Sequence, residues 1–143
     1  MGTEQNKIKH LEFIQSNIGR MNQCSFQMKG WMIAIVSAIL ALYASSISPE
    51  SGLGNNMFLY IAIAPTVLFW FLDSYYLQQE RKFRGIYNDL IDPSSKVLIN
   101  DFAMPLNNYV GCKYCLLNVM FSKTEAPLYC SITLGLVLAG YYL

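Results

Sequence analysis

The sequence predicts an all-α integral membrane protein with three transmembrane helices, an N-terminal amphipathic helix and a cytoplasmic helical extension of the second span. Its 143 residues are 54% hydrophobic and only 13% charged, which is too little charge to cover an ordinary soluble domain. Three apolar runs contain no charged residue, and a helix of about 20 such residues crosses the hydrocarbon core of a bilayer. All ten Lys and Arg side chains lie outside these runs. A bilayer is therefore the expected solvent of the chain.

Residues 1–29 predict a cytoplasmic amphipathic arm. Apolar side chains recur there at three- and four-residue steps, as in a helix with one apolar stripe: Ile8, Leu11, Ile14, Ile18 and Met21. We expect this stripe to pack on another cytoplasmic helix, because it is narrow and carries little basic excess; binding along the inner membrane surface is the alternative. The polar residues before the first apolar run argue against a cleavable signal peptide.

Residues 30–48 predict the first transmembrane helix, and residues 49–57 a short external loop without Lys or Arg. Residues 58–91 predict the second transmembrane helix together with its cytoplasmic extension. No Gly or Pro follows the apolar part of this run before Gly85. Pro65 lies in the middle of the span and predicts a kink.

Asp92 to Ser95 is a turn signal that ends the second helix. Residues 92–125 predict a cytoplasmic loop region, with a short strand or coil followed by a helix near Tyr109 to Met120. Ser122 to Glu125 has the pattern of a capping box before the third transmembrane helix, residues 126–143. The alternative, indicated by Pro127, is that the regular helix begins nearer Thr124. This third run is the weakest of the three candidates, because it has only 18 residues and no flanking charge beyond it. A re-entrant or cytoplasmic hairpin helix is therefore the alternative for it.

The distribution of basic residues predicts the orientation. Four Lys or Arg residues precede the first span, none lies in the first connection, and six lie between the second and third spans. Loops rich in Lys and Arg remain on the cytoplasmic side of a membrane. We therefore expect the N-terminus in the cytoplasm and the C-terminus outside.

Small residues at four-residue spacing mark candidate helix-packing faces in the first and third spans. Such residues allow close backbone approach between helices in lipid. They are Ala34, Ala38, Ser131, Gly135 and Ala139. The stripes fit packing within one subunit as well as between subunits. Because a three-helix unit has little internal core, we expect a homo-oligomer.

The densest polar cluster lies where the second helix leaves the membrane. It consists of Asp73, Glu80, Arg81, Arg84 and Tyr87. An acidic group at the hydrocarbon edge is costly unless paired or hydrated, so Asp73 should face a partner or an aqueous cavity. The alternative is a solvated helix end with an ordinary i,i+4 ion pair. The candidate polar rim or pore consists of this cluster together with two hydroxyl residues within the spans, Ser37 and Thr66.

No catalytic, cofactor or metal site is expected. Cys112 and Cys115 have CxxC spacing, but neither a second CxxC nor a His pair follows, and His10 is the one histidine. We interpret the two cysteines as ordinary buried thiols, and in a reducing cytoplasm structural disulfides are not expected. The net charge of +1 gives no support for direct nucleic-acid binding.

Three segments resemble a widespread family of small, uncharacterised bacterial membrane proteins: HLEFIQSNIGRMNQCSFQMKGW, FWFLDSYYLQQERKFRGIYNDL and FSKTEAPLY. The chain is also similar to the membrane accessory protein of type VI-B CRISPR loci and to two-span effectors of nucleotide-signalling defence systems. The resemblance implies a pore-forming oligomer in the bacterial inner membrane that acts in antiphage defence. The CRISPR protein's HEPN ribonuclease motif, Arg followed after four residues by His, would correspond here to Arg84 through Asp89. Because Asp stands in place of His, we expect no enzyme.

Two functional hypotheses follow. The first is a homo-oligomeric pore that perturbs membrane potential when activated. Because the spans are so apolar, a gated or hydrophobically closed pore fits better than an open channel. The second is a non-conducting membrane adaptor that recruits a soluble defence partner. In that case the arm and the region from Asp92 to Lys123 would recruit the partner, and the amphipathic face from Ile8 to Met21 would be a docking surface.

Overall fold

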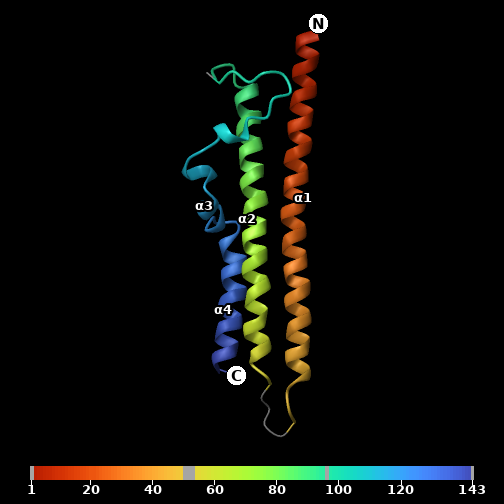
Figure 1. Ribbon diagram of the computed structural model, residues 1–143, viewed down its shortest axis with the longest axis vertical. Helices are drawn as coiled ribbons and strands as arrows, with labels where there is room; N and C mark the ends of the chain where they lie inside the picture. Colours follow the sequence, from red (N-terminus) through yellow and green to blue (C-terminus); the bar gives the residue numbers. More distant parts are fainter. Residues whose placement is uncertain (1, 50–53, 96, 143) are drawn as a thin grey trace.

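Two long antiparallel helices run along the protein, and a shorter third helix packs on one of them (Figure 1). The computed structural model describes residues 2–49, 54–95 and 97–142. The elements are α1 (Gly2–Ser45), α2 (Met57–Ile91), two 3-10 turns, η1 (Leu106–Asn108) and η2 (Cys112–Tyr114), the short α3 (Leu116–Met120), and α4 (Ala126–Tyr142). The described residues contain no strand, which confirms the all-α prediction.

The predicted arm and first span form one uninterrupted helix, α1, rather than two separate elements. At about 1.5 Å per residue its 44 residues extend over about 65 Å, about twice the thickness of a hydrocarbon core. Gly19 and Gly30 lie inside α1, where each costs about 1 kcal/mol relative to Ala. Packing of α1 along α2 compensates for this cost, so the helix continues through both positions.

The second helix is continuous from the apolar segment into the polar one, as its sequence predicts. α2 passes through Pro65 without losing helical structure and ends where Asp92 and Pro93 follow. At this end the Asp92 carboxylate accepts hydrogen bonds from the Ser94 hydroxyl and backbone N–H, which lower its pKa. The Asp92 backbone N–H still bonds to the Asn88 carbonyl, so the last turn is closed.

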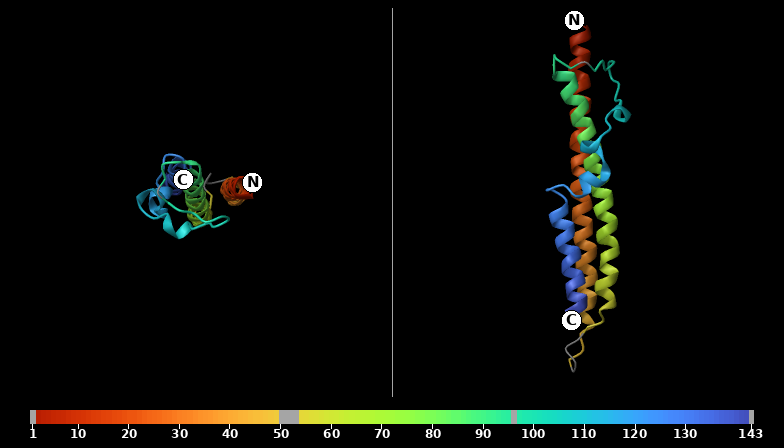
Figure 2. Two further views of the ribbon diagram at one scale, coloured as in Figure 1. Left: turned by 90° about the horizontal axis from the view of Figure 1, so that it is seen from above. Right: turned by 90° about the vertical axis from the view of Figure 1, so that its left-hand side faces the viewer.

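α2 is the central helix, with α1 and α4 on either side of it (Figure 2). Side chains from all three helices form one apolar cluster in the half that contains α4: Met32, Val36, Leu59, Ala62, Phe69, Tyr129 and Leu136. The far end of α4 is held by its Gly140 carbonyl, which accepts hydrogen bonds from Asn56 and Tyr60. Both termini of α4 are therefore attached to the two-helix hairpin.

The amphipathic stripe of the arm packs on α2, which confirms the first of the two sequence-based alternatives. Ile14 and Ile18 are buried in a second cluster with Phe83, Ile86 and Tyr109. The stripe does not pack along its whole length, because Ile8 is 58% exposed. The internal contacts use the central part of the stripe.

The segment between α2 and α4 is mostly coil, held against the hairpin by polar contacts. The His10 Nε2 atom lies 3.0 Å from the Ala103 carbonyl oxygen, and its Nδ1 accepts from the Phe102 backbone N–H at 3.3 Å. The Tyr109 hydroxyl donates to Asp89 at 2.5 Å; burial, followed by this carboxylate, raises the pKa of Tyr109. The helix expected near Tyr109 to Met120 is reduced to η2 and α3, because Gly111, with φ of 116°, breaks the segment.

α1 and α2 are both long and apolar enough to cross a membrane. α4 contains no charged residue but is shorter, with 17 residues. All three helices are present side by side only in the half of the molecule where α4 lies beside α2 (Figure 1).

Candidate functional site

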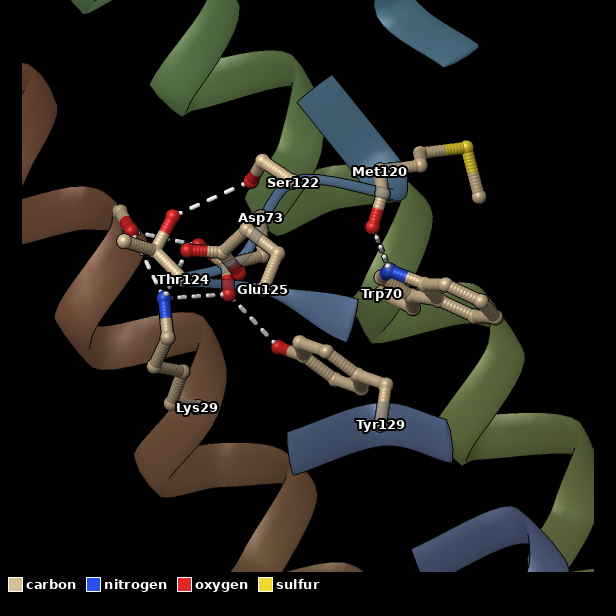
Figure 3. Close-up of polar contacts among 9 residues, drawn as sticks. Lys29, Trp70, Asp73, Met120, Ser122, Thr124, Glu125 and Tyr129 are labelled. Carbon is tan, nitrogen blue, oxygen red and sulfur yellow. Dashed lines mark hydrogen bonds and ion pairs between the residues drawn. The ribbon is translucent and has the colours of Figure 1, made fainter. Parts of the chain in front are cut away.

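A buried charged cluster joins the three main helices at one level. Lys29 on α1 lies just before the first apolar run, Asp73 on α2 just after the second, and Glu125 just before α4. Figure 3 shows these three side chains converging with the Tyr129 hydroxyl. The antiparallel arrangement of α1 and α2 brings these run ends, far apart in sequence, to the same level.

Lys29 is the central cation of this cluster. Its Nζ atom lies 2.6 Å from Asp73 Oδ2 and 3.0 Å from Glu125 Oε1. It also donates to the Ser25 hydroxyl at 3.1 Å. The Lys29 side chain is 24% exposed, whereas both carboxylates are buried. One ammonium group therefore serves two acidic groups.

Asp73 is the better satisfied of the two acids. It accepts a hydrogen bond from Ser25 at 2.5 Å and one from Tyr129 at 2.8 Å, in addition to the Lys29 contact. Three donors, one of them cationic, stabilise an ionised carboxylate in a buried position. Asp73 thus has the partners that an acidic group at the hydrocarbon edge requires.

Glu125 is the less satisfied acid. It is 3% exposed, and Oε1 contacts Lys29, whereas Oε2 is buried with no hydrogen-bond partner among the described residues. Burial and the neighbouring Asp73 raise the pKa of Glu125 to about 7, against the opposing effect of Lys29. The cluster can therefore take up or release a proton near neutral pH.

An aromatic group positions the start of α4 next to these charges. The Trp70 ring stacks on Tyr129, with centroids 5.9 Å apart and planes 8° apart. Trp70 Nε1 donates to the Met120 carbonyl at 3.1 Å, and the Phe121 ring meets Trp70 edge-on at 5.4 Å. Trp70 thereby links α2 to both α3 and α4.

The capping box predicted for Ser122 and Glu125 does not form, so this prediction was wrong. The Ser122 hydroxyl contacts Thr124, and the Glu125 carboxylate is directed to Lys29 instead of to its own backbone. The backbone N–H groups of Glu125 and Ala126 bond to the Ser122 carbonyl. Because the Glu125 side chain pairs with Lys29 across the helices, it does not form the local cap.

The predicted polar rim divides into two separate parts. Glu80 is buried and pairs with Arg84, one turn further on, at 2.7 Å. Tyr87 and Arg84 border a small cavity of about 240 Å³ between α1 and α2, and Arg81 is half-buried. Asp73 belongs to the Lys29 cluster, so the rim residues do not form one site with it.

The two hydroxyl residues of the candidate pore have different environments. Thr66 is fully buried and donates to the Ala62 carbonyl at 2.9 Å. Thr66 and Asp73 therefore face the interior of the subunit. Ser37 is exposed on α1.

An apolar groove of about 410 Å³ lies between α1 and α4, and α2 contributes to it through Leu59. The structure brings four small residues to its walls, Ser37 from α1 and three from α4: Ser131, Gly135 and Ala139. Ala34 and Ala38 are exposed on α1 but do not line the groove. The predicted packing stripe of the third span therefore faces an open groove.

Sequence reasoning missed Lys29, Glu125, Tyr129 and Ser25 as partners of Asp73. The available signal was that Lys29, Asp73 and Glu125 each adjoin one end of an apolar run. All four cysteines are free thiols, and Cys24 is half-buried. Cys112 and Cys115 are exposed, so the prediction that they are buried was wrong, and Cys130 is exposed as well. Among residues 2–49, 54–95 and 97–142, no group of three His, Cys, Asp or Glu side chains is arranged to hold a metal ion.

The fold and the site define an all-helical protein with two helices of membrane-spanning length and a buried charged cluster joining three helices. No protein-family model, curated protein or solved structure matches the chain.

Proposed function

We propose that the chain is a subunit of a homo-oligomeric pore in the bacterial inner membrane, which perturbs membrane potential when activated during phage infection. Each subunit crosses the membrane three times, with its N-terminus in the cytoplasm and its C-terminus outside. The observation that carries this proposal is the open groove between α1 and α4.

The groove supports self-association because it has the chemistry of a helix-packing surface. Gly135 and Ala139 allow a neighbouring backbone to approach closely, and close packing is a main source of helix association in lipid. No atom of another described element lies within 4 Å of the position that a Cβ on Gly135 would take. This space is available to a neighbouring subunit.

The surface of the apolar half supports a pore that is closed at rest. Ser37 and Ser131 are exposed on the groove side, but most of the exposed side chains around them are aliphatic or aromatic. Hydrophobic constrictions exclude water and ions until a rearrangement widens them. Conduction therefore requires activation rather than a permanent polar path.

Aromatic residues support the membrane placement. Trp31 at one end of the apolar half is 60% exposed, and Tyr141 and Tyr142 are exposed at the other end. Trp and Tyr are enriched at the two membrane interfaces, where their rings lie at the level of the headgroups. The basic residues on the Trp31 side support a cytoplasmic location for that side.

Filling the groove tests this proposal. Gly135→Leu adds a side chain where the subunit has room, so the monomer should fold while neighbouring helices are kept apart. We expect loss of the oligomer on size-exclusion chromatography with light scattering. We also expect loss of the phage-induced depolarisation measured with a voltage-sensitive dye.

Leu134→Phe is the matched control, because Leu134 is exposed on α4 outside the groove. It should keep both the oligomer and the depolarisation. A Gly135→Leu variant that depolarises cells like the wild type would contradict the proposal, as would a wild-type protein that never changes membrane potential.

One observation favours the membrane adaptor as a second candidate. Ile8 and Phe13 are 58% and 56% exposed in the polar half, so this half has apolar surface that the fold does not cover. The docking face expected from Ile8 to Met21 is not free as a whole, because Ile14 and Ile18 are buried on α2. An adaptor would lose activity in an Ile8→Asp, Phe13→Asp variant while its oligomeric state stays unchanged.

A further inference from the structure

Glu125 is a buried titratable group that the packing of a pore does not require. Its neighbour Asp73 has three donors, but Glu125 has one, and its Oε2 atom has no partner among the described residues. A buried carboxylate oxygen without a donor is costly when ionised and is easily satisfied when it carries a proton. Glu125 Oε2 is therefore a position where a bound proton lowers the cost of burial.

We propose that Glu125 is a proton-binding site that holds the start of α4 against α1 and α2 when protonated and releases it when ionised. The consequence for conduction rests on the proposed pore, because movement of α4 would change the groove to which subunits bind. The proton-binding site itself does not depend on conduction.

The charge balance of the cluster gives the direction of this response. With Glu125 protonated, the cluster contains the Lys29 ammonium and the Asp73 carboxylate, which neutralise each other. The protonated Glu125 carboxyl can then donate a hydrogen bond to the neighbouring Asp73 carboxylate, which two ionised carboxylates cannot form. When Glu125 releases the proton to water, two buried carboxylates share one ammonium, and one negative charge is left without compensation.

The groups around Glu125 come from every element at this junction. α1 contributes Lys29 and Ser25, and α2 contributes Asp73. α4 contributes the Tyr129 hydroxyl, which is committed to Asp73. The cluster reaches solvent through Lys29, which is 24% exposed, so protons can exchange with water there. The pKa of Glu125, about 7, places the transition near neutral pH.

The position of Glu125 explains why α4 is the element that responds. α1 and α4 both pack on α2, and the Lys29–Glu125 ion pair ties α1 directly to the residue before α4. The groove leaves α1 and α4 apart along their apolar halves. Ionisation of Glu125 leaves this ion pair in place but adds the repulsion from Asp73 and the cost of a second buried carboxylate, so the start of α4 moves away without disrupting the α1–α2 hairpin.

The test is an intrasubunit distance measured by pulsed electron paramagnetic resonance. Spin labels are placed at the exposed positions Ile35 on α1 and Leu134 on α4, with the four cysteines replaced by serine. Labelled subunits are diluted with unlabelled ones in lipid nanodiscs and compared about one pH unit below and above the Glu125 pKa of about 7. We expect a narrow distance distribution at the lower pH and a longer, broader one at the higher pH.

Glu125→Gln, which resembles the protonated side chain, should keep the narrow distribution at both pH values. Glu80→Gln is the matched control, because Glu80 is also a buried acid with a single ion pair, and it should keep the wild-type response. Equal distances at both pH values in the wild type, or a normal response in Glu125→Gln, would overturn the proposal.

A direct titration keeps the proposal open to refutation if Glu125→Gln does not fold. Infrared spectra of the wild type should show a buried carboxylic acid band that disappears as pH rises through about 7. A Glu125 that remains ionised well below this pH would overturn the proton site. A pH-dependent distance without any ion flux would instead leave the proton site standing and count against the pore.

Discussion

At the scale of single residues, the buried charged cluster depends on Lys29. Among the described residues, this side chain is the one cation in contact with both Asp73 and Glu125, and it also binds Ser25. Removing one partner of a buried ionic group costs more than the pair contributes, because the remaining charges are left uncompensated in a poorly solvated place. Lys29 is thus more important to stability than its partly exposed position on α1 suggests.

Lys29→Met should lower the free energy of unfolding by about 3 kcal/mol, as expected when a buried charge loses its partner. The measurement is unfolding in detergent, followed by the fluorescence of Trp70, which stacks on Tyr129 beside the cluster. The double variant Lys29→Met, Glu125→Gln should recover part of this loss, because it removes one uncompensated acid. Equal stability of wild type and Lys29→Met would show that the cluster is not structural.

The raised pKa of Glu125 also predicts how stability depends on pH. The folded state binds this proton with a pKa of about 7, above the ordinary value of 4.5. Between these two values the folded protein holds more protons than the unfolded chain, so stability falls as pH rises from about 4.5 to about 7. Above this window Glu125 contributes no further change.

Midpoints of thermal unfolding, measured across this range, check the sign of the effect. The decline should be absent in Glu125→Gln and present in Glu80→Gln. A wild-type midpoint that rises steadily across the same pH range would contradict the assignment of the proton to Glu125.

At the scale of elements, the segment between α2 and α4 illustrates what the sequence can and cannot predict. Asp92 and Pro93 correctly indicate the end of α2, because an acceptor side chain followed by proline ends a helix. The contacts that hold the following coil involve partners distant in sequence, such as His10 with Ala103 and Tyr109 with Asp89. No local pattern specifies these pairs.

Gly85 is the residue of α2 that allows this coil to pack closely. A Cβ at this position would lie 2.6 Å from the Tyr109 ring and 2.7 Å from the Tyr114 hydroxyl. Neither residue can move easily, because Tyr109 is bonded to Asp89 and the Tyr114 carbonyl to Gln78. Gly85→Ala should therefore cost about 1–3 kcal/mol and displace the coil.

Hydrogen–deuterium exchange should show this displacement as faster exchange in residues 102–115 of Gly85→Ala. Gly19→Ala is the matched control within α1, where a Cβ meets no atom of another described element. It should stabilise the protein by about 0.5–1 kcal/mol, through the lower entropy of its unfolded state. Similar effects of the two substitutions would contradict the packing described for Gly85.

At the scale of the whole molecule, the sequence predicted the long helices well and the charged cluster incompletely. The apolar runs and the stripe that contains Ile14 and Ile18 are patterns of the local sequence, and the fold contains the corresponding helices. Lys29 and Glu125 are 96 residues apart, and only the antiparallel packing on α2 makes them neighbours. The continuity of α1 was missed because the change from polar to apolar residues was interpreted as a boundary between two elements.

The proposed function requires that several copies of this three-helix subunit assemble around a pore. α2 is covered on two sides, whereas the outer faces of α1 and α4 and the groove between them remain apolar and open. Single-particle imaging of the full chain in lipid nanodiscs tests this claim most directly. We expect a ring of subunits in which α4 of one copy packs at the groove of another. The ring should surround an axial opening that is narrowed by apolar side chains. Particles that contain one subunit each, with the groove filled by lipid, would contradict it.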